Sequence, residues 1–286
     1  MALAKVSDIL KTADQGKYAV IGFDAFNLES IRLIIDTAEE MKTPVILMIY
    51  PAMKTIMPYS TFAAVTRDLA SKVDVKVGLM LDHGPSFEDA MEAVAGGFSS
   101  IMIDYSHLEF EENIRLTKEV VRACHGLGID VEGELGRVGV AANEEDYTNT
   151  DYYTRADKAA EYVERTGVDA LAVAIGTAHG NYISEPKLDL DRLMEINRAV
   201  DIPLVLHGGT GVPEEQIRQA VLLGINKLNL ATGYNLKMYD VYKRIIEEQK
   251  SRPRMTDLIL AAEEDIKVYL RKAMRMVHPE AGREYA

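Results

Sequence analysis

Three of the six histidines lie at or just after the ends of apolar runs, and carboxylates accompany them. His83 follows Asp82 where one run ends, His207 ends a second run, and His179 comes shortly after a third. Catalytic zinc takes three protein ligands, often imidazoles, and keeps a fourth position open. A single histidine of this kind is more often a buried structural residue, whereas three at equivalent places favour a metal site. The histidines outside this pattern are interpreted as surface or capping residues: His107, His125 and His278.

The adjacent pair Asp82-His83 raises a geometric problem. Neighbouring residues on a regular strand point to opposite faces, so these two side chains could not both reach one site. We therefore expect the strand to lose its regularity at Asp82. Ser86 is better placed than Asp82 to cap the following helix, which leaves Asp82 free for chemistry.

Glycine-rich segments follow two of the same apolar runs. One is the stretch 207–211 (HGGTG), which leads toward a helix, and the other is 229–233 (NLATG). Backbone N–H groups in such loops and at helix N-termini bind phosphate, and in α/β barrels the loops after strands seven and eight often do so. Glycines alone indicate only tight turns, but at these positions they favour a phosphorylated small molecule held beside a divalent metal.

Eight apolar runs rich in Val, Ile and Leu recur along the chain, with helical patterns between them. Continuous rather than alternating hydrophobicity is typical of strands that are covered on both faces, as in parallel sheets. The runs occupy 18–24, 43–50, 76–82, 99–105, 130–135, 170–175, 203–208 and 227–232.

Strand and helix alternate with about 30 residues per unit, which is the length of a βαβ repeat. Eight such repeats predict a (β/α)8 TIM barrel. Ser86-Phe-Glu-Asp has the pattern of a capping box, and Pro213 stands where a helix would begin. A doubly wound sheet is the alternative, but the first strand-to-helix turn lacks the G-x-G-x-x-G fingerprint. Since the active site of such barrels lies at the carboxyl ends of the strands, the polar residues there are candidates for function: Asp24, Tyr50, Asp104, Glu134 and Asn229.

Residues 1–13 are expected to form an amphipathic first helix. A final amphipathic helix should place Ile259, Ala262, Ile266, Ala273 and Val277 on one stripe, beyond the eighth unit. It would cap the barrel or pack on another subunit. We expect residues 1–286 to form a single domain.

The bulk composition excludes several classes of function. A net charge of −13 argues against a nucleic-acid partner, which requires a basic face. No apolar run approaches the length of a membrane span, and the N-terminal segment has no signal-peptide core. The single cysteine, Cys124, rules out an internal disulfide and is consistent with a reducing cytoplasm, where we expect the protein to act.

The sequence resembles the class II (zinc-dependent) fructose-bisphosphate and tagatose-bisphosphate aldolases, and most closely their shorter branch. The likeness runs nearly the whole length and includes 97–113 around the fourth strand. Five motifs in the family's order carry it: Leu81-Asp82-His83-Gly84, Glu132-Gly133-Glu134-Leu135-Gly136, Gly176-Thr177-Ala178-His179-Gly180, His207-Gly208-Gly209-Thr210-Gly211 and Asn229-Leu230-Ala231-Thr232.

Carried over by position, the resemblance implies that His83, His179 and His207 bind the catalytic Zn²⁺. Asp82 would be the acid/base for the substrate's C4 hydroxyl, and Asp104 and Glu134 would hold the metal in an alternative position. The family also places a Na⁺ or K⁺ near the phosphate and assembles as homo-oligomers, which suggests a homodimer or homotetramer. The cradle for dihydroxyacetone phosphate would comprise Gly180, Gly208, Gly209, Thr210, Asn229, Ala231 and Thr232.

The chain departs from the family pattern on the side of the pocket that would hold the aldehyde. Asp24 replaces a family asparagine, and Tyr50 replaces a small serine. A carboxylate at Asp24 would repel a nearby phosphate, and Tyr50 would reduce the room, so we expect fructose 1,6-bisphosphate to be a poor substrate.

Two further positions match the family less well. The loop after the fifth strand carries its acids late, so Glu144 or Glu145 could donate a proton to the enediolate carbon; of the two, Glu145 is our candidate catalytic residue, although both could be an ordinary solvated run. Arg254 resembles an arginine that reaches the distal phosphate from a neighbouring subunit.

The leading hypothesis is therefore a zinc-dependent aldolase of carbohydrate metabolism that acts on a ketose phosphate or bisphosphate. An aldolase for a different phosphorylated keto-sugar is the nearest alternative. A catalytically silent paralogue that binds sugar phosphate is another, although Asp82 and the three histidines are intact. A barrel metallohydrolase would have no use for the glycine-rich loops.

Overall fold

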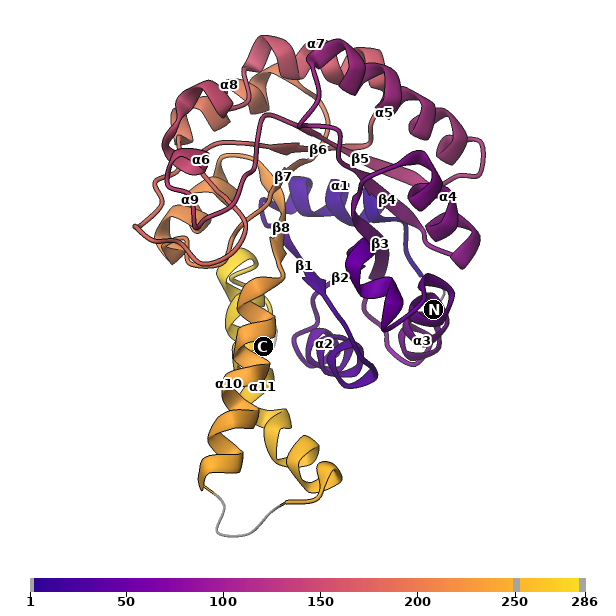
Figure 1. Ribbon diagram of the computed structural model, residues 1–286, viewed down its shortest axis with the longest axis vertical. Coiled ribbons are helices and arrows are strands. Elements are labelled where there is room, and N and C mark those ends of the chain that lie inside the picture. The colour runs from indigo at the N-terminus through magenta and orange to yellow at the C-terminus, as the bar shows by residue number, and fades with distance from the viewer. Residues whose placement is uncertain (1–2, 249–252, 283–286) are drawn as a thin grey trace.

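Eight parallel strands close a barrel in chain order, with β8 paired back to β1 (Figure 1). The structure is a computed structural model that describes residues 3–248 and 253–282. All eight predicted strands are present, and the predicted (β/α)8 TIM barrel is confirmed. The strands are β1 Val20–Asp24, β2 Val45–Ile49, β3 Val77–Gly84, β4 Ser100–Ile103, β5 Asp130–Leu135, β6 Ala170–Val173, β7 Leu204–Leu206 and β8 Ile225–Leu230.

The strands are buried on both faces, which is why their sequences read as continuous apolar runs. On β2, Leu47 belongs to the core between the barrel and its helices, while its neighbours Ile46 and Met48 belong to the core inside the barrel. Six of the strands supply both cores by simple alternation, whereas β5 and β8 contribute only to the outer one. The inner core fills the amino end of the barrel and leaves the carboxyl end for polar residues.

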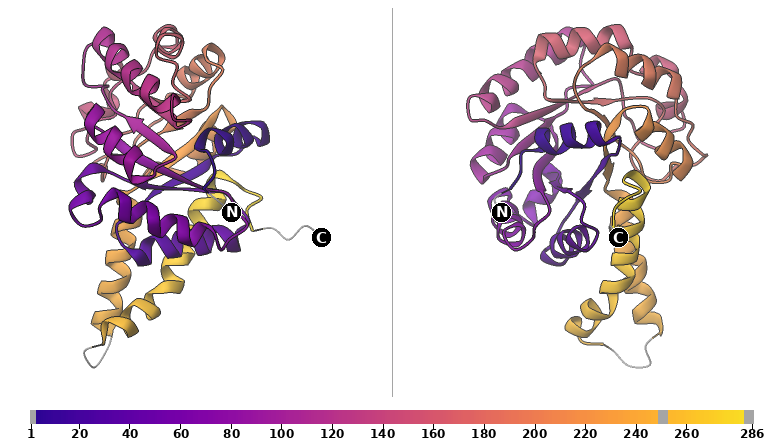
Figure 2. Two further views of the ribbon diagram at one scale, coloured as in Figure 1. Left: turned by 90° about the vertical axis from the view of Figure 1, so that its right-hand side faces the viewer. Right: turned by 180° about the vertical axis from the view of Figure 1, so that it is seen from behind.

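Helices surround the barrel, and α1 closes its amino end. Val6, Ile9, Leu10 and Ala13 of α1 pack into the inner core, and Figure 2 (right) shows α1 lying across the barrel. The predicted first helix is therefore present. In the described residues the α-helices are α1 Val6–Gly16, α2 Leu28–Glu40, α3 Tyr59–Ala70, α4 Phe87–Gly96, α5 Phe110–His125, α6 Glu145–Thr148, α7 Ala156–Thr166, α8 Leu190–Ala199, α9 Glu214–Leu222, α10 Thr232–Glu248 and α11 Met255–Val277, with short 3₁₀ helices at Pro51–Thr55 and Thr150–Tyr152.

The C-terminal helix α11 runs beside α10, and the two form a hairpin that projects from the barrel (Figures 1 and 2). Its inner end is tied to the start of β1 by a hydrogen bond from the Ala19 amide to the Val277 carbonyl at 2.9 Å. The buried stripe begins at Leu258 rather than at Ile259, which is only partly buried, because Leu258 lies on the side of α11 that packs inward. Within the described residues, none of the helices is long and apolar enough to span a membrane.

The helix signals read from the sequence are largely confirmed. Ser86 caps α4 by accepting a hydrogen bond from the Asp89 amide at 3.1 Å, but the expected capping box is only half formed. The Asp89 carboxylate accepts from the Ser86 hydroxyl and from Lys54 instead of from the Ser86 backbone, because an aspartate is shorter than the usual glutamate and a cation lies nearby. Pro213 is the N-cap residue of α9, as its position predicted.

Strand β3 loses its regularity at its carboxyl end, as expected. Its pairing with β4 shifts register between Leu81 and Gly84, and His83 adopts a left-handed φ of 46°. A side chain rarely tolerates this conformation, and such local strain is typical of functional positions. The irregularity allows Asp82 and His83 to approach the same cavity despite being adjacent.

Candidate active site

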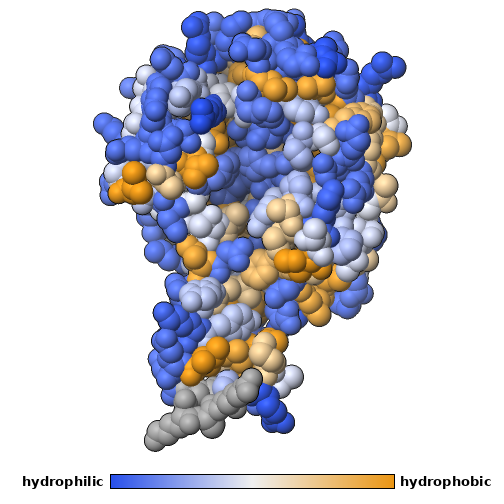
Figure 3. All heavy atoms as spheres, in the orientation of Figure 1, coloured by the Kyte–Doolittle hydropathy of each residue, from blue (hydrophilic) through white to orange (hydrophobic). Residues whose placement is uncertain are grey.

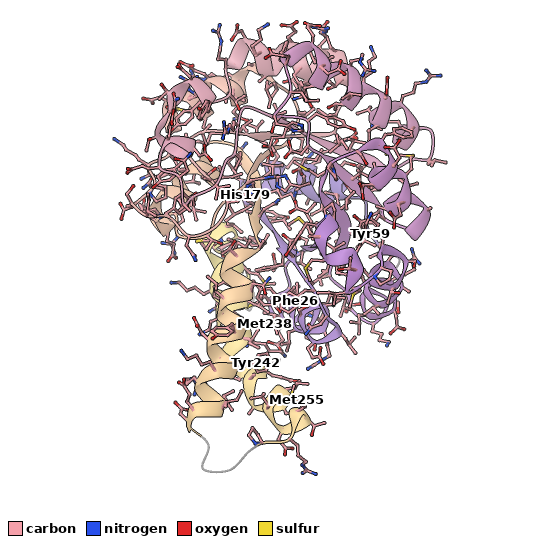
Figure 4. All side chains as sticks on the ribbon, viewed as in Figure 1. Phe26, Tyr59, His179, Met238, Tyr242 and Met255 are labelled. Atoms are coloured by element: carbon pink, nitrogen blue, oxygen red, sulfur yellow. The ribbon has the colours of Figure 1, made fainter. Side chains whose placement is uncertain are left out.

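The predicted polar residues gather at the carboxyl end of the barrel. Three of them lie at the last or next-to-last position of their strands: Asp24, Glu134 and Asn229. Two more follow their strands by one residue: Asp104 and His207. Figure 4 places His179 in the mouth of the barrel, and Figure 3 shows hydrophilic residues around the hollow there. The three histidines lie together, since their ligand atoms are within 4.8 Å of one another.

The ring nitrogens of the histidines are arranged for a cation. His83 Nδ1 lies 2.9 Å from Asp104 Oδ2, and His207 Nε2 lies 2.9 Å from Glu132 Oε1. Carboxylates accept hydrogen bonds, so these nitrogens carry the hydrogens. The remaining nitrogens, His83 Nε2 and His207 Nδ1, then face each other at 3.0 Å with lone pairs. Such a pair calls for a positive charge between the rings.

The pKa values at the site reflect the same demand for positive charge. Burial alone would lower the pKa of His83, but Asp82, Asp104 and Glu134 raise it to about 10. Burial and the neighbouring histidines lower the pKa of His179 to about 3, which keeps that imidazole neutral and able to bind a metal. A metal ion at these nitrogens would supply the positive charge that the surrounding carboxylates favour. The donor set therefore fits Zn²⁺.

Two acidic residues extend this site, as the resemblance implied. His83, Asp104 and Glu134 form a second group whose ligand atoms lie close enough to hold an ion. Glu134 Oε2 is buried, receives no hydrogen bond from the described part of the chain, and lies 3.3 Å from His207 Nδ1. Burial and the charge of Asp104 raise the pKa of Glu134 well above its usual value. An unpartnered buried oxygen beside an imidazole nitrogen is consistent with a metal position there.

Two residues to which the sequence analysis gave no role complete the polar cluster. Glu132 lies on β5 beside His207, and Lys227 lies on β8 with its ammonium 2.7 Å from Glu132 Oε2. Burial would raise the pKa of Glu132, but Lys227 and the hydrogen bond from His207 lower it to about 2. The sequence does contain a pattern that points to these residues. Glu132 and Glu134, and likewise Lys227 and Asn229, are polar residues two positions apart in an apolar run, so each pair lies on one face of its strand.

The residues predicted to cradle the phosphate line one cavity together with Asp82 and His179. Gly208 has a φ of 68°, and a Cβ there would meet the Ala178 carbonyl oxygen at 2.4 Å, so only glycine allows this approach. Helix α10 begins at Thr232, which lines the same cavity, and the Gly233 amide at its N-terminus donates a hydrogen bond to the Thr210 hydroxyl there. The residues that line the cavity are Asp24, Asp82, His179, Gly180, Gly208, Gly209, Thr210, Asn229, Ala231 and Thr232.

Asp24 is buried against Asp82, and this changes the expectation drawn from its charge. Asp24 is 2% exposed, no donor among the described residues reaches either of its oxygens, and its side chain lies within hydrogen-bonding reach of Asp82. Burial and then the charge of Asp82 raise the pKa of Asp24 well above its usual value. An uncharged Asp24 would not repel a phosphate. Tyr50 lies close enough to both acids for their charges to raise its pKa, in addition to the larger effect of burial.

The structure does not bring the loop acids or Arg254 to the cavity. Glu144 and Glu145 are exposed at the start of α6, and Glu144 accepts a hydrogen bond from the Ser184 hydroxyl at 2.6 Å. Arg254 is 85% exposed and pairs with Asp257. It precedes Met255, which Figure 4 places at the tip of the hairpin, away from His179.

The comparisons with known proteins agree with this geometry. A family model for class II fructose-bisphosphate aldolase matches residues 4–282. The chain belongs to the class II fructose-bisphosphate aldolase family. It is therefore a member of a lyase family, and the resemblance read from the five motifs is confirmed.

Individual relatives of this class II aldolase are similar over nearly their whole lengths. The chain is 37% identical over 277 residues to the D-tagatose-1,6-bisphosphate aldolase subunit GatY of Klebsiella oxytoca, covering 96% of this chain and 98% of the relative. The crystal structure of the YdjI aldolase of Escherichia coli K12 superposes with a TM-score of 0.87 at 35% identity, covering 99% of this chain and 100% of that one. The fructose-bisphosphate aldolase of Campylobacter jejuni, at 20% identity, shares the fold with a TM-score of 0.83, covering 99% and 97% of the two chains.

We predict that His83→Ala, His179→Ala and His207→Ala each lower bound zinc and abolish aldolase activity, because a three-ligand site has no spare donor. Elemental analysis of the purified variants measures the metal. His125→Ala is the control, since that histidine pairs with Asp169 away from the site. Full zinc occupancy in any of the three variants would remove that histidine from the ligand set.

Proposed function

We propose that this class II aldolase is zinc-dependent and reversibly cleaves a ketose phosphate or bisphosphate into dihydroxyacetone phosphate and an aldehyde. The observation that supports this most is that Asp82 and His179 share one cavity with the glycine-rich cradle. A proton acceptor, a metal ligand and a phosphate site would then meet at this cavity. The chain would act as a single catalytic domain.

The side chains have distinct tasks in this proposal. Zn²⁺ on His83, His179 and His207 would polarise the substrate carbonyl. Asp82 would take the C4 hydroxyl proton as the C3–C4 bond breaks and the electron pair passes into the enediolate. The Asn229 amide, which donates to Asp82 Oδ1 at 3.1 Å, would hold that carboxylate in place. The cradle amides at Gly208, Gly209 and the start of α10 would bind the phosphate.

A proton must then be returned to C3 to give the ketone product. Glu145 is our candidate donor, and Glu144 is the alternative. Both are exposed and outside the cavity, so either would require the 137–148 loop to move over the substrate. The hydrogen bond from Ser184 restrains Glu144 and not Glu145, which favours Glu145.

We further propose that a second copy of this chain packs against the α10–α11 hairpin to give a homodimer or homotetramer. Tyr239, Ile246, Met255 and Leu260 are 51–68% exposed on these two helices, and Figure 3 shows apolar atoms on the hairpin. Such exposure is unusual for a monomer. Assembly could bring Arg254 to a neighbouring cavity, where it would bind a distal phosphate. A Na⁺ or K⁺ beside the cradle remains part of the proposal.

Two other functions compete with this one. A silent paralogue would bind sugar phosphate without cleaving it, and an aldolase for a different phosphorylated keto-sugar would cleave another substrate. The intact Asp82 and metal-binding histidines favour catalysis. A retro-aldol screen of phosphorylated ketoses, read as triose phosphate released by the zinc-loaded protein, separates the three. Release from no ketose in the screen would favour the silent paralogue.

We predict that Asp82→Ala keeps its zinc but loses cleavage by at least about 100-fold, which is typical for a lost general acid/base. Triose phosphate release under saturating substrate measures the rate, and elemental analysis confirms the metal. Turnover within a few-fold of the parent protein would contradict the role given to Asp82.

We predict that Glu145→Gln slows protonation of the enediolate, whereas the matched Glu144→Gln does not. Exchange of a hydrogen on the hydroxymethyl carbon of dihydroxyacetone phosphate, which corresponds to C3 of the ketose, with deuterated water isolates this step from bond cleavage. The rate of exchange should fall by about 100-fold in Glu145→Gln alone. The reverse pattern would assign the step to Glu144. Unchanged exchange in both variants would exclude the pair.

Substrate choice is expected to depend on Tyr50 rather than on Asp24. We predict that fructose 1,6-bisphosphate is cleaved less efficiently than another ketose phosphate, because Tyr50 restricts the aldehyde side. Tyr50→Ser should raise kcat/KM for fructose 1,6-bisphosphate by about 10- to 100-fold, the equivalent of relieving an overpacked contact. Asp24→Asn should leave it within about threefold, since burial beside Asp82 raises the pKa of this acid and so disfavours its charge. A large gain in Asp24→Asn with none in Tyr50→Ser would show that charge sets the preference.

A further inference from the structure

A fully buried lysine, Lys227, lies inside the barrel on β8, two residues before Asn229, which lines the cavity. Lys227 is 0% exposed, and its ammonium is 2.7 Å from Glu132 Oε2, which is itself 1% exposed. Burying an ion pair is costly, and an apolar pair of similar size is often as stable or more stable. The inner core beside this pair is built of apolar residues such as Met80, Met102 and Val205, which shows that the barrel can fill this space without charge.

The pair is connected to one of the proposed metal ligands. Glu132 uses Oε2 for Lys227 and Oε1 for His207 Nε2 at 2.9 Å, so each carboxylate oxygen has one donor. Because the carboxylate accepts, the His207 hydrogen lies on Nε2 and the lone pair on Nδ1. Nδ1 is the atom that faces His83 Nε2 at 3.0 Å.

Three different strands supply this chain of contacts, so the barrel itself fixes its geometry. Glu132 lies on β5, His207 follows β7, and Lys227 lies on β8. Glu132 shares the inner face of β5 with Glu134, and Lys227 shares that of β8 with Asn229, because residues two apart on a strand point the same way. Strands are more rigid supports than loops, and a metal ligand needs a fixed ring orientation.

We propose that Lys227 and Glu132 are positioning residues that hold His207 in the tautomer and ring orientation required for metal binding. This inference rests on the proposed function only in taking the metal to be zinc. Lys227 acts through Glu132: without the ammonium, Glu132 Oε2 loses its donor, and the carboxylate is free to turn away from His207. Outer partners of this kind typically change metal affinity by about 10- to 100-fold.

The test is zinc affinity, measured by titrating the zinc-loaded protein with a competing chelator. Glu132→Gln and Lys227→Met should each weaken zinc binding by about 10- to 100-fold. The double variant Glu132→Gln/Lys227→Met should be no weaker than the weaker single variant, because both changes break the same chain of contacts. The Co²⁺-substituted proteins should show altered absorption, which reports the ligand geometry directly.

Asp130→Asn is the matched control. Asp130 is a buried carboxylate on the same strand, but it lies at the other end of β5, where it accepts a hydrogen bond from the Ser7 amide at 2.9 Å. This variant should bind zinc like the parent protein, even if it melts at a lower temperature.

Two results would overturn the inference. One is a folded Lys227→Met protein that binds zinc with parental affinity and differs only in melting temperature, which would make the ion pair purely structural. If Lys227→Met does not fold, the charge-free double variant decides the question, and parental zinc affinity there has the same meaning. Because zinc binding is measured without substrate, loss of the proposed aldolase activity would not be mistaken for failure of this inference.

Discussion

The carboxyl end of the barrel depends on one constraint, which is that buried charges must be balanced. Five acids and three histidines lie within a small volume, and most of the buried acids there contact a basic or hydrogen-bonding side chain. Asp104 contacts His83, Glu132 contacts Lys227 and His207, and burial together with the charge of Asp82 raises the pKa of Asp24. Removing one partner from such a cluster leaves an uncompensated charge in a medium that stabilises it poorly. The remaining deficit, at the facing nitrogens of His83 and His207, is where a metal ion fits.

The barrel satisfies this constraint by dividing its interior into two zones. Apolar residues and helix α1 fill the amino end, while the polar residues occupy the last positions of the strands. Parallel strands bring these positions to one rim from distant parts of the sequence, so that β3 and β8 contribute neighbouring groups. Strand β3 departs from regular geometry at its carboxyl end, where two adjacent residues are both required.

Much of the fold could be predicted from sequence because its signals are local. Eight apolar runs and their helix signals specify the barrel, and the order of the strand-end residues specifies the histidine cluster and the cradle. What could not be predicted depends on three-dimensional pairing. Asp24 could be recognised as a departure, but the raised pKa of its carboxyl follows from burial against Asp82. Glu132 and Lys227 lie 95 residues apart, and no local pattern shows that their charges meet. The reach of Arg254 and of the loop acids depends on a partner subunit or a motion, neither of which a single chain encodes locally.

The buried lysine gives the most informative comparison between stability and function. If stability alone had shaped the interior, an apolar residue at Lys227 and another at Glu132 would extend the inner core and avoid the desolvation of two charges. The barrel instead retains a cation whose partner, Glu132, also contacts a histidine of the proposed metal site. An apolar residue in place of Glu132 could fill the space, but it could not accept the hydrogen bond from His207 and so could not fix which nitrogen of that ring carries the hydrogen. A carboxylate at that depth in turn requires a cation, and β8 provides it two residues before Asn229, which contacts Asp82. Strand β8 thus supports one proposed metal ligand, His207, and the proposed proton acceptor, Asp82, which ties the two halves of the proposed chemistry to the same rigid element.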